Sequence, residues 1–273
     1  MASQLHANNL LDRVAQNKVS TALGIRSFPL AETILVAKTA GYDSVFIDLE
    51  HTTLTMKDCG QLCITAMQAG ITPFVRVPHQ CGDGFIQRVL DAGAMGIVVP
   101  HIHGVEDSKK VIGISKYPPV GHRSLTGSLP HFDLKPLPAP VTAPLLNERG
   151  STVFLMIETK DALENVDAIA ALPGCDVLLV GANDLSIEIG TLPDFDHPRF
   201  IAALEKVSAA CKKHGKIFGI GGLYHRPDLM ERLINEMGCR WILGGLDLSL
   251  MLNGAKANCE TLSKCSAKLT GKL

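Results

Sequence analysis

The chain has 273 residues, of which 46% are hydrophobic, and its formal net charge is −1. This length suits one large domain, and the near-neutral charge argues against nucleic-acid or membrane-surface binding, since both favour a basic excess. No apolar stretch reaches the roughly 18 residues of a membrane span. The N-terminal residues show no secretory pattern and the eight cysteines form no Cys-x-x-Cys pair, so a reduced, cytoplasmic location is expected.

A leading helix is predicted over residues 5–17, after which strands and helices alternate along the chain. The predicted strands span 20–26, 44–48, 72–76, 95–99, 152–158, 176–181, 216–221 and 240–244. The predicted helices span 29–40, 55–69, 83–92, 105–115, 160–171, 198–213, 226–237 and 246–262. Most of these strands are short, β-branched apolar runs without polar alternation, which is typical of buried parallel strands.

Eight successive βα units are what a closed barrel needs. We therefore predict an α/β fold, a (β/α)8 TIM barrel with an N-terminal helix. A single domain would span residues 1–273, with the barrel over about 20–250 and a C-terminal helical tail over 251–273. Residues 255–273 are helix-like but lysine-rich, and this stretch is expected to fray unless it docks on a partner.

A proline-rich segment over residues 116–150 interrupts the alternation. A long structureless segment in a compact domain is usually functional or disordered. Because this one leaves the fourth helix and leads into the fifth strand, we predict a long insertion before strand 5. It is expected to cover the barrel mouth or to reach a neighbouring subunit.

Polar side chains stand at the carboxyl ends of several predicted strands, which is where βα folds bind ligands. They are Asp48, Glu50 and His51 after the second strand, Arg76 after the third, Glu158 after the fifth, and Asn183 and Asp184 after the sixth. Their convergence would make a metal-assisted site for an anionic substrate.

Glu158 and Asp184 are the candidate metal ligands. Hard divalent cations such as Mg²⁺ or Mn²⁺ prefer carboxylate oxygens and keep waters or substrate oxygens in their other positions. The alternative is that each acid merely caps the following helix. That alternative suits Asp184 better than Glu158, which ends a long apolar run.

Arg76 is a candidate for binding a substrate oxyanion, because an arginine at a strand end needs an anion or a carboxylate partner. A structural salt bridge to Asp48 or Glu50 is the alternative. His51 stands beside acidic residues, and a carboxylate that fixes the imidazole tautomer makes a general base.

Backbone N–H groups of Asn183 and Asp184, at a strand-to-helix turn, could bind the carboxylate of a small acid. Two other clusters compete. His101 and His103, with His225, could ligate zinc in a hydrolase, and the glycines at the ends of the last two strands could bind phosphate. No lysine ends a strand at the mouth, which disfavours a Schiff-base mechanism.

Short motifs occur in a recognisable order over about residues 20–250. They are Phe46-Ile-Asp-Leu-Glu-His51, Phe74-Val-Arg76, Tyr117-Pro-Pro119 with Gly121-His-Arg123, Met156-Ile-Glu158 and Gly181-Ala-Asn-Asp-Leu-Ser186. Together they resemble the HpcH/HpaI aldolase and citrate lyase family. Three further stretches resemble its fungal macrophomate synthase-like branch: Ser27-Phe-Pro-Leu30, Gly121-His-Arg-Ser124 and Leu129-Pro-His-Phe132.

The resemblance implies a (β/α)8 barrel that assembles as a homo-oligomer, often a hexamer, with helices exchanged between paired subunits. It implies a divalent metal on Glu158 and Asp184, with Mg²⁺ as the expected cation and Mn²⁺ or Co²⁺ as alternatives. A pyruvate-type 2-oxo acid would bind this metal and the backbone amides around Asn183 and Asp184. Arg76 would stabilise the enolate.

In the same scheme His51 would move the proton together with Asp48. Glu50 and Arg123 complete the substrate-binding candidates, Arg123 because the 120–150 segment would line the aldehyde pocket. The resemblance thus implies a class II pyruvate aldolase, a carbon–carbon lyase acting on 4-hydroxy-2-oxo acids through a metal-bound pyruvate enolate. Alternatives are an oxaloacetate decarboxylase, a macrophomate synthase-like enzyme that captures the enolate, and a non-catalytic barrel that binds 2-oxo acids.

Overall fold

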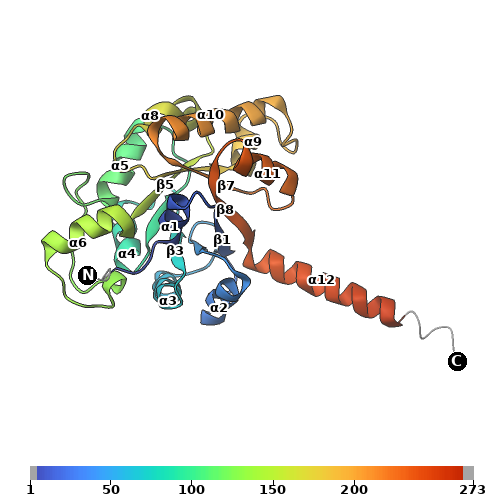
Figure 1. Cartoon of the computed structure of the whole chain (residues 1–273), viewed down its shortest axis with the longest axis horizontal. Coiled ribbons are helices and arrows are strands. Elements are labelled where there is room, and N and C mark those ends of the chain that lie inside the picture. Colours follow the sequence, from blue (N-terminus) through green and yellow to red (C-terminus); the bar gives the residue numbers. More distant parts are fainter. Residues whose placement is uncertain (1–4, 267–273) are drawn as a thin grey trace.

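The computed structural model describes residues 5–266, and eight parallel strands form a closed barrel at its centre (Figure 1). The strands are β1 (Ser20–Ile25), β2 (Ser44–Asp48), β3 (Thr72–Arg76), β4 (Gly96–Val99), β5 (Thr152–Ile157), β6 (Val177–Gly181), β7 (Ile217–Gly221) and β8 (Cys239–Leu246). Each strand pairs with the next in sequence and β8 pairs with β1. The predicted (β/α)8 barrel is confirmed, and every predicted strand agrees with an observed one to within two residues.

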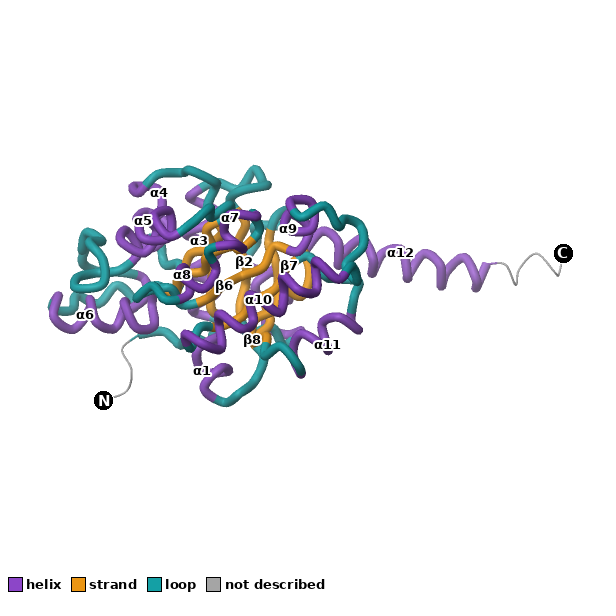
Figure 2. Tube along the Cα trace, turned by 90° about the horizontal axis from the view of Figure 1, so that it is seen from above, coloured by secondary structure: helices purple, strands orange, loops and turns teal. Residues whose placement is uncertain are grey.

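Helices surround the strands (Figure 2). They are α1 (Asn9–Ala15), α2 (Ala31–Ala40), α3 (Met56–Gln68), α4 (Asp83–Asp91), α5 (Val105–Ser115), α6 (Ala139–Leu145), α7 (Lys160–Glu164), α8 (Val166–Ala170), α9 (Ala182–Glu188), α10 (Pro198–His214), α11 (Pro227–Asn235) and α12 (Asp247–Ser266). The helix predicted over 160–171 is two short helices that meet at Asn165. No helix within residues 5–266 is long and apolar enough to cross a membrane.

Aromatic rings fill the inside of the barrel. The Phe74 and Phe154 rings lie 4.8 Å apart between centroids, and Phe154 and Trp241 lie 5.2 Å apart. All three side chains are fully buried, and Phe46 packs beside Trp241. As in other small barrels, the interior is therefore a packed core rather than a pore, and a ligand site must lie at an end of the barrel.

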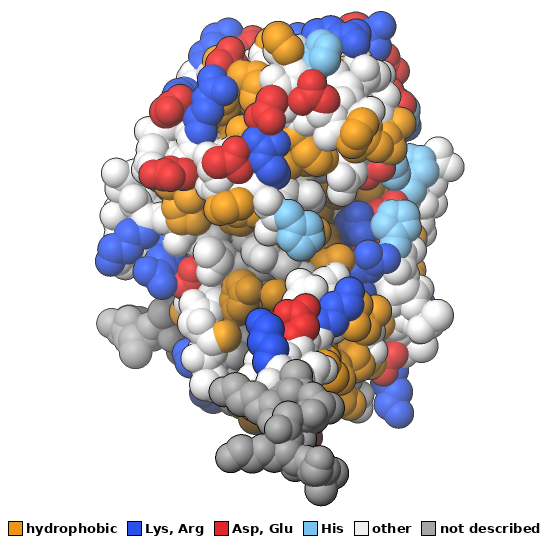
Figure 3. Space-filling view, turned by 90° about the vertical axis from the view of Figure 1, so that its right-hand side faces the viewer, with side chains coloured by type: hydrophobic (Ala, Val, Ile, Leu, Met, Phe, Trp, Pro, Cys, Tyr) orange, Lys and Arg blue, Asp and Glu red, His pale blue; other side chains and the backbone are white. Residues whose placement is uncertain are grey.

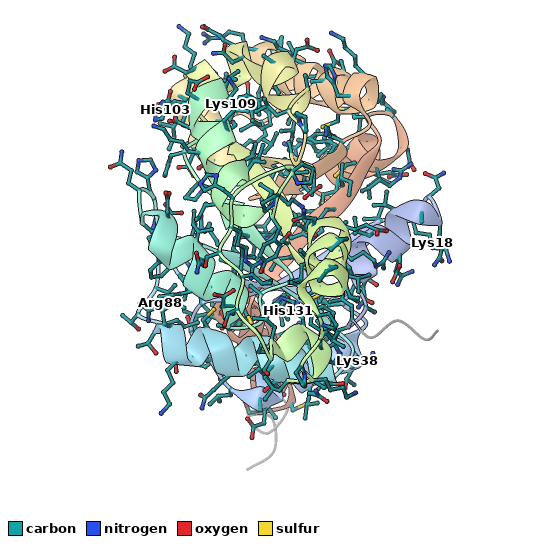
Figure 4. All side chains as sticks on the ribbon, turned by 90° about the vertical axis from the view of Figure 1, so that its left-hand side faces the viewer. Lys18, Lys38, Arg88, His103, Lys109 and His131 are labelled. Carbon is teal, nitrogen blue, oxygen red and sulfur yellow. The ribbon has the colours of Figure 1, made fainter. Side chains whose placement is uncertain are left out.

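The segment over residues 116–150 lies at the end of the barrel opposite to the expected one. Lys116 Nζ is 2.8 Å from Asp176 Oδ2, just before β6, and a ring nitrogen of His131 is 3.0 Å from the carbonyl oxygen of Ala94, just before β4. His131 lies among interior side chains, far from His103 (Figure 4). Of the two roles predicted for this segment, covering the mouth is wrong, because its apolar residues close the core beneath the amino-terminal ends of the strands. Contact with a neighbouring subunit stays a prediction.

The last helix, α12, extends away from the barrel in both ribbon views (Figures 1 and 2). Asp247 is buried, whereas all residues from Leu248 to Ser266 are exposed. Hydrophobic side chains are visible beside this helix in the space-filling view (Figure 3). Fraying was expected over 255–273, but the helix is continuous to Ser266, and residues 267–273 lie outside the described part of the chain.

Candidate active site

A cavity of about 190 Å³ lies at the carboxyl ends of the strands. Apolar side chains in its wall include Phe46, Met156 and Leu243. The cavity is also lined by five of the residues that the sequence singled out, namely Asp48, His51, Arg76, Asn183 and Asp184. Barrel closure brings these side chains together although they are spread over more than a hundred positions of the chain.

Asp48 and Arg76 form the central ion pair. They are opposite one another in the register of β2 and β3, and Arg76 donates from Nε to Asp48 Oδ1 at 2.8 Å and from Nη2 to Oδ2 at 2.6 Å. Arg76 Nη1 also lies 3.0 Å from Glu50 Oε2. Although burial of Asp48 opposes its ionisation, the hydrogen bonds and charge of Arg76 hold the pKa of this carboxyl below its usual value.

Glu158, directly after β5, is a buried carboxylate with one free oxygen. Its side chain is 1% exposed, and Oε1 accepts a hydrogen bond from the backbone N–H of His101 at 2.7 Å. Oε2 is buried and has no hydrogen-bond partner within residues 5–266. Burial raises the pKa of Glu158 to about 7, and the charge of Asp184 adds to this rise while the His101 contacts oppose it.

Gly181 makes room for this carboxylate. A Cβ atom at position 181 would lie 2.2 Å from Glu158 Oε2, so any side chain here would displace the carboxylate from its place. Since a buried polar atom without a partner calls for a ligand, the free oxygen and the space beside it fit a bound cation.

Asp184 supplies a second carboxylate. It lies in the first turn of α9, where it is exposed and lines the cavity. Two carboxylates are a donor set that suits a hard divalent cation and leaves positions for water or substrate oxygens. In the described part of the chain, no three His, Cys, Asp or Glu side chains are grouped to hold a metal. The zinc alternative at His101 and His103 therefore lacks a ligand set.

The acid beside the His51 imidazole is Glu50, whereas the sequence predicted Asp48. Its imidazole is 55% exposed, with Nε2 3.6 Å from Glu50 Oε2. Asp48 directs its oxygens to Arg76, to Arg26 and to the backbone N–H groups of Glu50 and His51. These two arginines occupy the Asp48 carboxylate, so Glu50 is the acid that contacts the imidazole.

Three residues near the site were not predicted from the sequence to belong to it. His101 has a positive φ of 51° and places Nδ1 3.4 Å from Glu158 Oε1 and Nε2 3.6 Å from Glu50 Oε1. The His-x-His pattern marked the position but was interpreted as a zinc motif. Arg26 and Tyr224 line the cavity itself. A basic residue directly after the first strand was the available signal for Arg26.

Arg123 is absent from this site. Its side chain is buried, with Nη2 2.6 Å from Asp91 Oδ1 and the guanidinium 4.9 Å from the centre of the Tyr117 ring. Asp91 ends α4, just before β4 begins, so Arg123 lies at the amino-terminal end of the barrel. Its assignment as a substrate-binding residue is wrong, because the segment that carries it packs on the opposite face.

Comparisons with known proteins point in one direction. The family model described as HpcH/HpaI aldolase/citrate lyase matches residues 29–254. A 4-hydroxy-4-methyl-2-oxoglutarate aldolase of Hapsidospora irregularis is 44% identical over 250 residues, covering 92% of this chain and 93% of its own. The crystal structure of an HpcH/HpaI aldolase from Desulfitobacterium hafniense DCB-2 is similar with a TM-score of 0.86 at 26% identity, covering 94% of this chain and 97% of its own. Macrophomate synthase is similar with a TM-score of 0.76 at 30% identity, over 97% of this chain and 90% of its own.

Because the pKa of Glu158 is raised, we predict that the affinity for the metal depends on pH. A carboxyl must lose its proton to bind a cation, and with a pKa of about 7 Glu158 is mostly protonated one unit lower. Mg²⁺ or Mn²⁺ is therefore expected to bind about tenfold more weakly near pH 6 than near pH 8. Isothermal titration calorimetry measures this difference.

The Glu158→Gln variant should bind metal weakly with little dependence on pH. Glu148→Gln, an exposed change outside the cavity, is the control and should behave as the unmodified chain does. An affinity that stays constant over this pH range in the unmodified protein would show that Glu158 does not gate metal binding.

Proposed function

The chain belongs to the HpcH/HpaI aldolase/citrate lyase family, and we propose that it is a divalent-metal-dependent aldolase that cleaves or forms 4-hydroxy-2-oxo acids through a pyruvate enolate. The observation that carries this proposal is the buried Glu158 carboxylate, whose free oxygen lies beside Gly181. The cavity that contains Asp184 and Arg76 adjoins it.

Family membership confirms two predictions made from the sequence, namely the family itself and an aldolase-type carbon–carbon lyase. The aldolases of this family are of the divalent-metal-dependent class. We propose Mg²⁺ as the cation, with Mn²⁺ or Co²⁺ able to replace it, and Glu158 and Asp184 as the residues that would hold it. When bound, such a cation supplies a Lewis acid that stabilises negative charge developing on the substrate.

Arg76 would provide the second positive charge at this place. Its guanidinium is fixed by two hydrogen bonds to Asp48 and by the contact with Glu50. A donor that is already held in position needs no reorganisation when the enolate forms, which is how preorganised groups lower a barrier. The backbone amides of Asn183 and Asp184 would hold the substrate carboxylate.

Proton transfer falls to His51 in this proposal. In the cleavage direction a base removes the proton of the 4-hydroxyl group, and the C3–C4 bond then breaks. His51 Nε2 faces Glu50, which would fix the tautomer and support the imidazolium. Nδ1 is then the atom left to accept the hydroxyl proton, directly or through water. Glu50 replaces Asp48 as the partner of His51, while Asp48 positions Arg76.

The substrate we propose is 4-hydroxy-4-methyl-2-oxoglutarate, for which the 44% identical relative is named. Breaking its C3–C4 bond gives one pyruvate as the enolate and a second pyruvate as the carbonyl product. Oxaloacetate is a second candidate, favoured by the similarity to macrophomate synthase. It would yield the same enolate by loss of CO₂, without a hydroxyl proton for His51 to remove.

Metal-stripped protein should release pyruvate from 4-hydroxy-4-methyl-2-oxoglutarate only after Mg²⁺, Mn²⁺ or Co²⁺ is added. Glu158→Gln is expected to lower the rate by about 100-fold or more, because it removes a charged ligand of the cation. Glu148→Gln serves again as the control. A coupled assay for pyruvate measures each rate, and release without metal, or full activity in Glu158→Gln, would contradict the proposal.

A variant of the proposed base separates the alternatives. His51→Asn should slow cleavage of the hydroxy acid while leaving oxaloacetate decarboxylation much less affected, since only the first reaction needs a base. Decarboxylation without any cleavage would make the decarboxylase the better description. No turnover of either compound would favour the non-catalytic barrel.

We further propose that the chain forms homo-oligomers through α12, a hexamer if the family resemblance extends to assembly. The helix carries Leu248, Met251 and Leu252, all exposed, at spacings of three and four residues that place them on one side. The body of the barrel also exposes Leu35 and Val36 on α2. Apolar surface of this kind is typical of contacts between subunits.

Replacing Leu248 and Met251 together by glutamate should convert the oligomer into smaller species, because two charges would have to be buried in the contact. Replacing Asn253 and Ala257 together by glutamate, on the other side of the same helix, is the matched control for two added negative charges and should retain the assembly. Size-exclusion chromatography with light scattering gives the mass. A monomeric unmodified chain, or an intact oligomer in the double variant, would refute the role of α12.

A further inference from the structure

Arg26 is a second arginine in the cavity, and the mechanism above leaves it without a task. It directly follows β1, and its side chain is 35% exposed. Nε lies 3.2 Å from Asp48 Oδ2, and Nη2 donates to the carbonyl oxygen of His51 at 2.7 Å. Its third nitrogen, Nη1, makes no hydrogen bond to any residue between 5 and 266. Arg26 thus offers a nitrogen with both N–H groups unpaired to the cavity. Each nitrogen of Arg76 already contacts Asp48 or Glu50, and these contacts leave the second N–H of Nη1 and of Nη2 for the enolate.

The backbone of Arg26 is held as firmly as its side chain. Asp247, the buried first residue of α12, accepts hydrogen bonds on Oδ2 from the N–H groups of Arg26, Ser27 and Phe28 at 3.1, 2.9 and 2.8 Å. A carboxylate that takes three backbone donors fixes the turn after β1. An arginine positioned in this way loses little conformational freedom when it binds an anion.

Barrel topology places Arg26 across the mouth from the metal ligands. The strands follow one another around the barrel in sequence order, so β1 stands opposite β5. Glu158 follows β5 and Arg26 follows β1. A ligand that binds through its 2-oxo acid end near Glu158 and Asp184 would therefore extend its other end toward Arg26, and the interior of an eight-stranded barrel is narrow.

Tyr224 adds a neutral donor on the same side. It lies between β7 and α11 and lines the cavity with Arg26. Burial raises the pKa of its phenol, against the positive charges of Arg76 and Arg26, so the group stays protonated at neutral pH. A guanidinium and a phenol together form a charge-assisted recognition pair for a carboxylate.

A second cavity, of about 340 Å³, offers a competing cation. It is lined by Lys110 together with His79, His101 and His103, and it lies between the loops after β3 and β4. These loops follow β3 and β4, and β4 is adjacent to β5. Lys110 therefore lies on the same side of the mouth as Glu158, not across it as Arg26 does. Arg26 is the better placed of the two.

We propose that Arg26 and Tyr224 bind the distal carboxylate of the substrate and give this site a preference for dicarboxylic over monocarboxylic 2-oxo acids. The proposal rests on the proposed function only for the orientation of the 2-oxo acid at Glu158 and Asp184. It makes Arg26 a specificity-determining residue: its interaction distinguishes substrates at the end remote from the bond that breaks.

Two ligands that differ only in the distal carboxylate test this directly. 2-Oxoglutarate and 2-oxopentanoate have the same chain length, and neither has the 4-hydroxyl group needed for cleavage. Dissociation constants are measured by calorimetry with Mg²⁺ present. The unmodified protein is expected to bind 2-oxoglutarate about tenfold more tightly or better, as expected for a charged hydrogen-bonded pair.

Arg26→Gln should bring this ratio close to one, Arg26→Lys should retain part of it, and Tyr224→Phe should lower it several-fold. Lys110→Gln is the control and should keep the full ratio. Arg26→Lys and Tyr224→Phe keep the test decisive if Arg26→Gln fails to fold, since folding is checked by thermal melting.

A ratio near one in the unmodified protein, or no detectable binding of either ligand, would overturn the proposal. So would a ratio that survives all three changes at Arg26 and Tyr224, or one that Lys110→Gln abolishes. This test measures binding and not turnover, so it is independent of the lyase assay. If the protein lacked lyase activity but still preferred 2-oxoglutarate through Arg26, the proposed function would be refuted and this inference would hold.

Discussion

The site depends on one buried carboxylate, that of Asp48. It is fully inaccessible to solvent, and it accepts hydrogen bonds or ion pairs from Arg76, Arg26 and the backbone N–H of Glu50. Removing a carboxylate from water is unfavourable unless such partners compensate for lost hydration. Since the register of β2 and β3 sets Asp48 opposite Arg76, formation of the barrel itself positions both arginines.

Asp48 and Glu158 show how environment gives two acids different tasks. Arg76 keeps the pKa of Asp48 low despite burial, whereas burial with few partners raises that of Glu158 to about 7. Carboxyl groups whose pKa values are pushed apart commonly mark an active site. The paired acid fixes the arginines, and the unpaired acid keeps an oxygen free for a ligand.

The fold and the polar ring at the mouth could be predicted because parallel strands in a barrel all present their carboxyl ends to one face. Asp48, Arg76, Glu158 and Asp184 each follow an apolar strand, so their convergence needs only the strand boundaries. The pairing of His51 could not be predicted in this way. β2 ends at Asp48 and residues 49–51 form a bend. Because the sequence does not give the course of this bend, proximity to Asp48 along the chain does not decide which acid the imidazole contacts.

The proline-rich segment over 116–150 was misplaced because prolines indicate a loop but not the end of the barrel on which that loop packs. Leu129, Phe132 and Leu146 decide this, since they complete the core beneath the strands. Arg123 belongs to this segment and was therefore assigned to the wrong end of the barrel. Arg26 was overlooked although it directly follows the first strand. The turn that holds it is fixed by Asp247, which is distant in sequence, so its orientation is known only from the folded chain.

The central claim is that the strand-end charges stabilise a pyruvate enolate, and proton exchange tests it most directly. Pyruvate is incubated with the protein and Mg²⁺ in D₂O, and loss of its methyl proton signal is followed by NMR. The account predicts exchange much faster than with Mg²⁺ alone or with metal-stripped protein, and strongly slowed in Arg76→Met. Exchange no faster than in the protein-free metal solution would contradict the claim.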